Sequence, residues 1–244
     1  MSKDERIKIL VGEKGYPGYD YSDGSINWIY CGGGGGGTFI AKDRTPLCVA
    51  GGGGSLTYNT YLTIESHACG QSTQLSANFG TGQATLKMGG KRTNAAGGGG
   101  FEGNGEDGSS WGKGGNSFIS GGARQTSGTS HSAYGGFGGG ASQYGICGYG
   151  AGGGGYTGGS GSANIKTQGG GGGSYFEGFY NNEFSEAISG CNVSLPTNRV
   201  TNGNGFALLT LLTNIPSATV IKCATCLYYN GHILWVHFLT LLSQ

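Results

Sequence analysis

Five glycine runs interrupt this chain, and each is flanked by segments with the character of ordered strands. The runs occupy Gly32–Gly37, Gly51–Gly54, Gly97–Gly100, Gly152–Gly155 and Gly169–Gly173. A glycine run normally behaves as a flexible linker. Here apolar, β-branched and aromatic residues lead into and out of the runs, as in WIYC before the first run and TFIAKD after it. This arrangement predicts that glycine main chain is itself part of the folded structure.

Composition narrows the class of protein. Glycine accounts for 57 of the 244 residues, but the chain has four prolines, which excludes the Gly-X-Y repeat of collagen. The formal net charge is +1, so the chain lacks the high charge of typical disordered proteins. The same near-neutral balance gives no electrostatic basis for nucleic-acid binding, and we expect no nucleic-acid partner.

Glycine runs can be ordered if they pack against one another. Polyproline-II-like helices repeat every three residues and have no internal hydrogen bonds, so their N–H and C=O groups point outward. Neighbouring polyglycine helices of this kind can approach closely and satisfy these groups laterally, as buried main-chain groups require. The sequence therefore favours a bundle of polyglycine-II helices. The alternative is fluctuating linkers between small β-structured patches.

The segments outside the glycine-rich middle predict a mainly β fold with little or no α-helix. Strand or hairpin character is found at 5–12, 25–31, 38–42, 46–50, 56–66 and 206–213. TFIA and PLCVA, joined through KDRT, predict a hairpin, and FALLTLLT after the NGNG turn signal predicts a closing strand. The best helix candidate is 182–189.

We expect one domain over residues 1–214. In it, β segments at about 5–66 and 206–213 bracket a glycine-rich lattice at about 95–174. The glycine-rich part has no fixed period, so a solenoid with one unit per repeat is not supported.

Residues 215–244 are of a different nature. Cys223 and Cys226 form the only local pair among the seven cysteines and are our candidate disulfide. Free thiols and half of a zinc site are the alternatives. The apolar stretch from Ile233 to Leu242 is too short to span a bilayer. It is interpreted as the start of a membrane helix, a buried strand or a sequence foreign to the domain, and no signal peptide is recognisable after Met1.

No motif for catalysis, cofactor binding or metal binding stands out. GYGAGG at 148–153 matches the GxGxxG pattern, but it neither follows a clear strand nor opens a helix. No HExxH segment and no kinase catalytic segment is present. We therefore expect no enzymatic activity, no cofactor and no metal in this chain. Asn192 begins the sole glycosylation sequon, which counts only if the chain is secreted.

Several motifs follow one another in a distinctive order. They are IKILVGEKG, CGGGGGGTFIAKD, TPLCVAGGGGS, GGFGGG, GGGGYTGG and GGGGGSYFEG, followed by the closing strand after NGNG. This order resembles the extracellular glycine-rich domain of the anaplastic lymphoma kinase / leukocyte tyrosine kinase receptor family. The resemblance covers about residues 5–214. Glycine-rich domains of this type also occur in protist proteins.

The resemblance implies a tumour-necrosis-factor-like β-sandwich packed with polyglycine helices, on the extracellular face of the plasma membrane. Members of the family are receptor protein-tyrosine kinases through a kinase domain that is absent from this chain. Their ligand is a secreted, helical, cytokine-like protein. A protein ligand and receptor dimerisation are accordingly expected.

Two classes of non-catalytic function follow. The first is a receptor-like ectodomain that binds a protein ligand. Its candidate contact residues are aromatic, because Tyr and Phe are enriched at interfaces: Tyr58, Tyr61, Tyr175, Phe176, Phe179 and Tyr180. The alternative role for these rings is packing against the glycine lattice.

The second class is a structural protein or tip adhesin that displays loops on a polyglycine-helix sandwich. The TFIA/PLCVA hairpin and the closing FALLTLL strand favour the first class, which predicts that these strands form a sandwich with the IKILV strand. A tip adhesin predicts few strands and an almost pure lattice.

Overall fold

The computed structural model describes residues 6–19, 29–57, 66–77, 84–109, 111–128, 132–144, 148–165 and 167–176, together with four two-residue strands nearer the carboxyl end. The regular secondary structure in these residues is antiparallel β-structure, apart from one short 3₁₀-helix, η1 (Ser66–Ala68). This confirms the expectation of a mainly β chain with almost no helix. The helix candidate at 182–189 lies outside the described residues.

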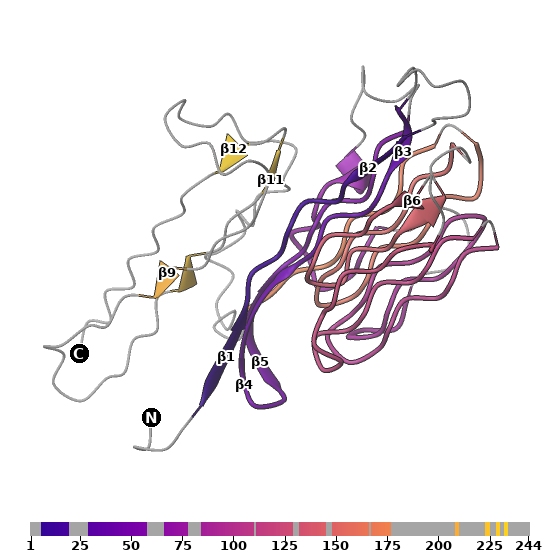
Figure 1. Ribbon diagram of the computed structural model, residues 1–244. Coiled ribbons are helices and arrows are strands. Elements are labelled where there is room, and N and C mark those ends of the chain that lie inside the picture. Colours follow the sequence, from indigo (N-terminus) through magenta and orange to yellow (C-terminus); the bar gives the residue numbers. More distant parts are fainter. Residues whose placement is uncertain are drawn as a thin grey trace, which may run out of the picture.

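The main sheet has four antiparallel strands in the order β1-β4-β5-β8. Their bounds are Ile7–Leu10, Thr38–Lys42, Thr45–Ala50 and Tyr175–Phe176. β4 and β5 form the predicted hairpin, and Asp43 in its turn has a φ of 53°. β1 pairs with β4 along its whole length, so the predicted first strand and the hairpin lie in one sheet (Figure 1).

The other described strands form two-stranded pairs. These pairs are β2 (Pro17–Tyr19) with β3 (Ile29–Gly32), β6 (Ser132–Ala133) with β7 (Gln143–Tyr144), β9 (Leu208–Leu209) with β10 (Cys223–Ala224), and β11 (Tyr228–Tyr229) with β12 (His232–Ile233). β3 overlaps the predicted strand 25–31. β9 falls within the predicted closing strand but pairs with β10 and not with the main sheet. Of the strand region expected at 56–66, Thr57 forms an isolated bridge with Cys31, and Ser66 begins η1.

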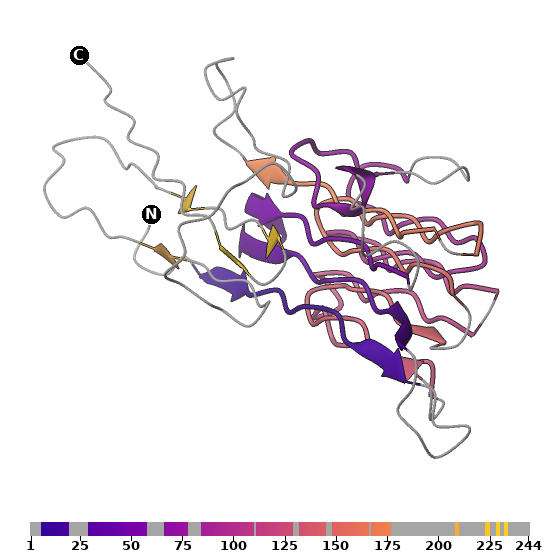
Figure 2. The ribbon, with the colours of Figure 1, turned by 90° about the horizontal axis from the view of Figure 1, so that it is seen from above.

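Glycine-rich segments fill the space between the main sheet and the β2–β3 and β6–β7 pairs, as long traces lying side by side (Figure 2). The six N–H groups of the first run donate in rotation to three neighbouring segments. Gly32 and Gly35 donate to the carbonyls of Leu56 and Gly53, Gly33 and Gly36 to Tyr16 and Glu13, and Gly34 and Gly37 to Ala141 and Gly138. Residues three apart therefore share a neighbour, as in a threefold helix. The run also accepts hydrogen bonds from other segments, for example at the carbonyls of Gly34 and Gly35.

The same spacing recurs in the later glycine-rich segments. Ala95, Gly98 and Phe101 donate to Ser162, Gly159 and Tyr156, an antiparallel neighbour, whereas Gly150, Gly153 and Tyr156 donate to Thr167, Gly170 and Gly173, a parallel one. Main-chain groups thus find partners on several sides of each segment. We call this hydrogen-bonded body of described segments the glycine lattice.

Close approach of main chains explains why most lattice positions are glycine. A Cβ atom at Gly34 would collide with the carbonyl oxygen of Gly152, and one at Gly98 with that of Gly153. Methyl groups occur where several can meet, because Ala96, Ala141 and Ala151 are fully buried in one cluster. The lattice therefore tolerates side chains only at particular places.

Hydroxyl groups replace carbonyl acceptors at the margins of the lattice. The Ser55 hydroxyl accepts a hydrogen bond from the N–H of Ala151 at 2.7 Å, and the Ser162 hydroxyl accepts one from the N–H of Gly150 at 2.8 Å. Both serines are buried. The Ser55 hydroxyl thus takes the place of a main-chain acceptor for Ala151, whereas the N–H of Gly150 is shared between the Ser162 hydroxyl and the carbonyl of Thr167.

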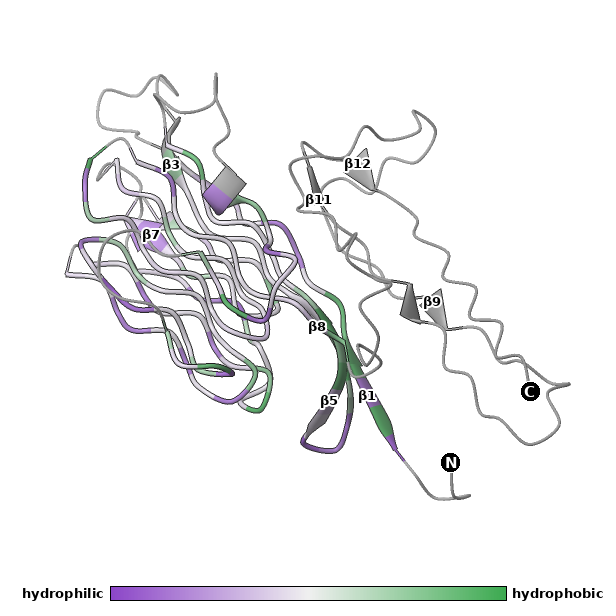
Figure 3. Ribbon diagram, turned by 180° about the vertical axis from the view of Figure 1, so that it is seen from behind, coloured by the Kyte–Doolittle hydropathy of each residue, from purple (hydrophilic) through white to green (hydrophobic). Residues whose placement is uncertain are grey.

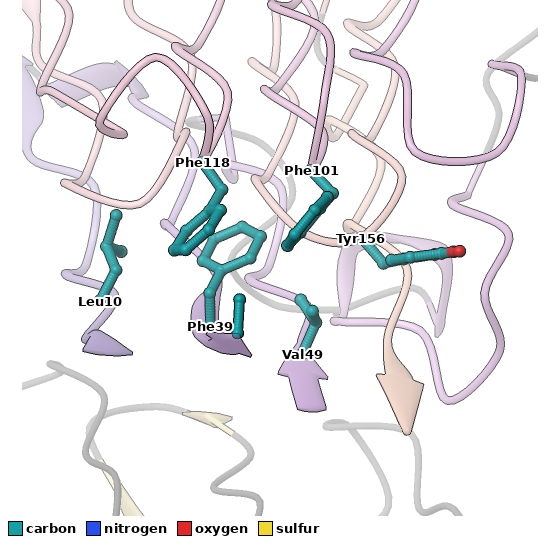
Figure 4. Close-up of a cluster of buried hydrophobic side chains, with 7 residues drawn as sticks. Leu10, Phe39, Val49, Phe101, Phe118 and Tyr156 are labelled. Carbon is teal, nitrogen blue, oxygen red and sulfur yellow. The ribbon is translucent and has the colours of Figure 1, made fainter. Parts of the chain in front are cut away.

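The apolar core lies where the main sheet meets the glycine lattice. Phe101 and Phe118 project from the lattice, and Phe39 and Val49 project toward them from β4 and β5 (Figure 4). The Phe118 ring stacks on those of Phe39 and Phe101, with centroids 5.1 Å and 4.9 Å apart. Figure 3 shows the hydrophobic strands of the main sheet beside the lattice, most of which has a hydropathy between the two extremes of the scale. Side-chain burial thus joins the sheet to a body that is itself held by main-chain hydrogen bonds.

The steric argument predicts different effects for the same substitution within one glycine run. Gly34→Ala should lower the free energy of unfolding by about 2 kcal/mol or more, since the new methyl group meets main-chain atoms that cannot move independently. Gly32→Ala is the matched control, because the nearest atom to its Cβ is the Ser55 Cβ at 3.6 Å. It should change stability by about 0.5 kcal/mol or less. Urea unfolding measures both, and equal losses would contradict the proposed cause.

Candidate binding site

The two described aromatic residues predicted to contact a partner lie on β8, on opposite faces of the main sheet. The Tyr175 ring stacks on Tyr156 with centroids 4.6 Å apart and packs against the core. Phe176 packs on the other face, beside Ile40 and Cys48. Both are half-buried. Tyr175 therefore packs against the lattice, as the alternative interpretation had it, and partner contact by these two residues stays a prediction.

The other predicted site residues are not placed. Those that fall outside the described residues are Tyr58, Tyr61, Phe179, Tyr180, Asn192 and Cys226. Cys223 begins β10. The predicted Cys223–Cys226 disulfide and the glycosylation of Asn192 remain predictions.

Three other cysteines are buried within the described residues. Cys48 and Cys69 are disulfide-bonded. Cys31 is a thiol that donates to the carbonyl of Tyr144 at 3.2 Å. The scattered spacing of the cysteines gave no signal for these roles. Disulfides form and persist in oxidising environments.

Trp111 is the most exposed large apolar side chain that the structure describes, with 71% of its surface accessible. It belongs to the turn formed by residues 107–109 and 111–113, which we call the Trp111 turn. Trp111 has a φ of 64°, in the left-handed region. A bulky residue rarely adopts this conformation, which costs about 1–2 kcal/mol. An exposed ring on a strained backbone is a candidate for molecular recognition.

Hydrogen bonds and an ion pair hold the Trp111 turn to the lattice. The N–H of Gly108 donates to the carbonyl of Gly112 at 3.0 Å. The Lys113 ammonium lies 2.7 Å from the Asp107 carboxylate, whose other oxygen accepts the N–H of Gly114 at 2.9 Å. The N–H of Lys113 donates to the Ser142 hydroxyl at 3.0 Å. The ion pair and the Gly108 hydrogen bond close the turn on itself, whereas the hydrogen bonds of Ser142 and Gly114 join it to the lattice.

A second exposed apolar residue lies on a turn that is tied to the first. Ile165 has 59% of its surface accessible. The Ser109 hydroxyl donates to the Asn94 side-chain oxygen at 3.0 Å, and the Asn94 amide donates to the carbonyl of Ala163 at 2.7 Å. Asn94 thus links the Trp111 turn to residues 163–165. We call these two turns together the distal surface.

Charges beside the distal surface are largely paired. Burial is the strongest influence on Asp107 and acts to raise its pKa, but the Lys113 ammonium and the N–H of Gly114 outweigh it, so the pKa is lowered. The N–H of Arg92 has the strongest influence on Glu106 and lowers its pKa; burial opposes this, and the Lys91 ammonium adds to it. Both carboxylates are therefore occupied by basic or N–H partners. The carboxylates of Glu106 and Asp107 therefore leave little unpaired negative charge at this surface.

The structure adds two further observations on possible chemistry. Within the residues that it describes, no three potential metal ligands gather at one place. In the same part of the chain, no helix has both the length and the hydropathy needed to cross a bilayer.

The comparisons with known proteins assign no family to this chain. No protein-family model matches the chain, and no curated protein matches its sequence.

Asp107 provides a test of how the Trp111 turn is held. Because folding lowers the pKa of Asp107, its ion pair stabilises the turn above the usual aspartate pKa, about 3.9, and is lost as the pH falls through the lowered value. In a Trp28→Phe/Trp235→Phe background, the fluorescence anisotropy of Trp111 should therefore fall on acidification below about pH 4. Asp107→Asn should show low anisotropy already at neutral pH. An acid transition of equal size in that variant would exclude Asp107 as its cause.

Proposed function

We propose that the glycine lattice is a bundle of polyglycine-II helices and that the main sheet is one layer of a β-sandwich. The three-residue rotation of N–H donors supports the first part, since it matches a helix with three residues per turn and no internal hydrogen bonds. Burial on both faces of the sheet supports the second part. Phe39 and Val49 are buried against the lattice, whereas Ile40 and Cys48 are buried on the opposite face.

Amide hydrogen exchange tests the lattice. Gly34, Gly98 and Gly153 each donate to a carbonyl in a distant segment, so their amides should exchange at rates set by opening of the whole domain. Gly121 and Gly128 are exposed and donate only within their own turns, to the Phe118 carbonyl and the Thr126 hydroxyl, so their amides should exchange quickly through local opening. Uniformly fast exchange of all glycine amides would instead indicate fluctuating linkers.

We further propose that the chain is a non-catalytic, receptor-like ectodomain that binds a protein ligand outside the cell. The observation that carries this proposal is Trp111, because an exposed indole on a strained, anchored turn has no evident structural purpose. The disulfide bonds of Cys48 and Cys69 support an extracellular setting. The resemblance to receptor ectodomains agrees with the pairing of β1 with the β4–β5 hairpin.

A tip adhesin is the second candidate function. It is favoured by the exposure of Trp111 and Ile165 on linked turns outside the main sheet, where a lattice would present them to a cell-surface target. The receptor-like function is preferred because the chain includes the four-stranded sheet, which an adhesin built almost purely of lattice does not need.

A binding screen separates these functions. Purified chain is assayed against arrays of secreted proteins and of cell-surface glycans, beside Trp111→Ser and the lattice control Gly32→Ala. The receptor-like function predicts a secreted protein whose binding falls by about tenfold or more in Trp111→Ser and is retained in Gly32→Ala. Binding confined to glycans would favour the adhesin. Absence of any binding that depends on Trp111 would remove the basis of both.

A further inference from the structure

Two energetically unfavourable features meet at the Trp111 turn. One is the left-handed backbone of Trp111. The other is Gln143 of β7, which is completely buried although neither its Oε1 nor its Nε2 atom has a hydrogen-bond partner. Gly112 joins the two features, because a Cβ atom on Gly112 would collide with the Gln143 Oε1 atom. The side-chain amide therefore lies directly against the turn that carries the exposed indole.

Each of the two features could be removed by its own single substitution, and neither substitution changes a glycine of the lattice. A buried amide without partners loses its hydration and gains nothing in return, whereas an apolar side chain of similar shape avoids this penalty. Methionine fits this description. A Cβ atom on Gly112 would meet the Ser142 carbonyl oxygen and the Ala96 methyl group as well as the Gln143 Oε1 atom, so both polar and apolar atoms line this place. Asparagine adopts the left-handed conformation of Trp111 far more readily than tryptophan does. Residues that lower stability at one place are typical of functional sites.

The polar atoms of Gln143 define what such a site can bind. A carboxamide offers one acceptor oxygen beside donor N–H groups. An extended peptide residue presents its own N–H and C=O on the same side, as in a hydrogen-bonded pair of an antiparallel sheet. Glycan hydroxyls would also seek carboxylate acceptors, but Asp107 is occupied by Lys113 and Gly114, and Glu106 by Lys91 and Arg92. The amide therefore suits a peptide main chain.

We propose that an extended peptide segment of the protein partner binds at Gln143 when the Trp111 turn moves aside. The peptide N–H and C=O pair with the Gln143 amide, and a neighbouring peptide side chain packs on the Trp111 indole. The Lys113–Asp107 ion pair and the Gly108–Gly112 hydrogen bond lie within the turn and can move with it. The movement has to break the two hydrogen bonds between the main chain of Lys113 and Ser142, and the hydrogen bonds of Ser109 to Thr93 and Asn94. This proposal rests on the proposed function and adds the chemistry of the partner to it.

Stability without ligand is the first test. Gln143→Met should raise the Tm by about 3 °C, and Trp111→Asn should leave it unchanged or raised. Gln168→Met is the matched control, because Gln168 is also buried, at 1% exposure, but engages in an interaction. This variant should lower the Tm. A fall in the Tm of Gln143→Met would show that the amide supports the fold, and would overturn the proposal.

Peptide binding is the second test. The probe is a positional-scanning library of linear octapeptides with acetylated and amidated ends, assayed beside an array of neutral glycans. Wild-type chain should bind a subset of peptides, and both Gln143→Met and Trp111→Asn should weaken that binding by about tenfold or more. Gln168→Met, assayed below its Tm, should retain it. N-methylation of the contacting peptide residue should weaken binding to the same extent, since it removes the N–H.

The outcomes separate this inference from the proposed function. Loss of a protein ligand in Trp111→Asn but not in Gln143→Met would leave the receptor-like function standing and refute the peptide site. Binding of glycans without binding of peptides would refute the proposed chemistry, as would a library with no bound peptide.

Discussion

Lateral hydrogen bonding between glycine-rich main chains is the interaction on which the rest of the structure depends. Successive N–H groups of one segment point to different neighbours, so no segment satisfies its main chain with a single partner. Order in one run therefore requires order in several others, and the lattice forms as a whole. Because main chains fill the space that side chains usually occupy, the apolar core is confined to the boundary with the main sheet, around Phe39, Phe101 and Phe118.

The sequence predicted the parts of the fold that rest on local patterns. Alternating apolar residues and turn signals indicated the β4–β5 hairpin and the β1 strand, and the structure places them in one sheet. The lateral pairing of glycine main chains followed from the need to satisfy buried N–H groups. By contrast, the place of β8 at the edge of this sheet depends on two residues from a distant segment. No periodicity reveals a strand of that length.

The candidate binding site was harder to predict for a different reason. Trp111 is one of several single aromatics among glycines, and its backbone conformation depends on how the turn is anchored to Asp107 and Ser142. The missing partners of Gln143 are likewise a property of its surroundings. Trp111 and Gln143 therefore point to a site only once the backbone conformation of the first and the missing hydrogen bonds of the second are known.

The alanine cluster has a consequence for how the chain finds its alignment. Glycine strings are alike at every position, so sliding one segment by three residues would bring the same donors to the same neighbours. Only the odd members of each string can tell the correct alignment from a shifted one. Ala96, Ala141 and Ala151 meet in one place. A shift of three residues in one of the two directions would bring them to the places of Gly99, Gly138 and Gly154, where a Cβ atom would collide with main-chain oxygens. These three alanine side chains therefore help to fix the alignment of the glycine-rich segments relative to one another.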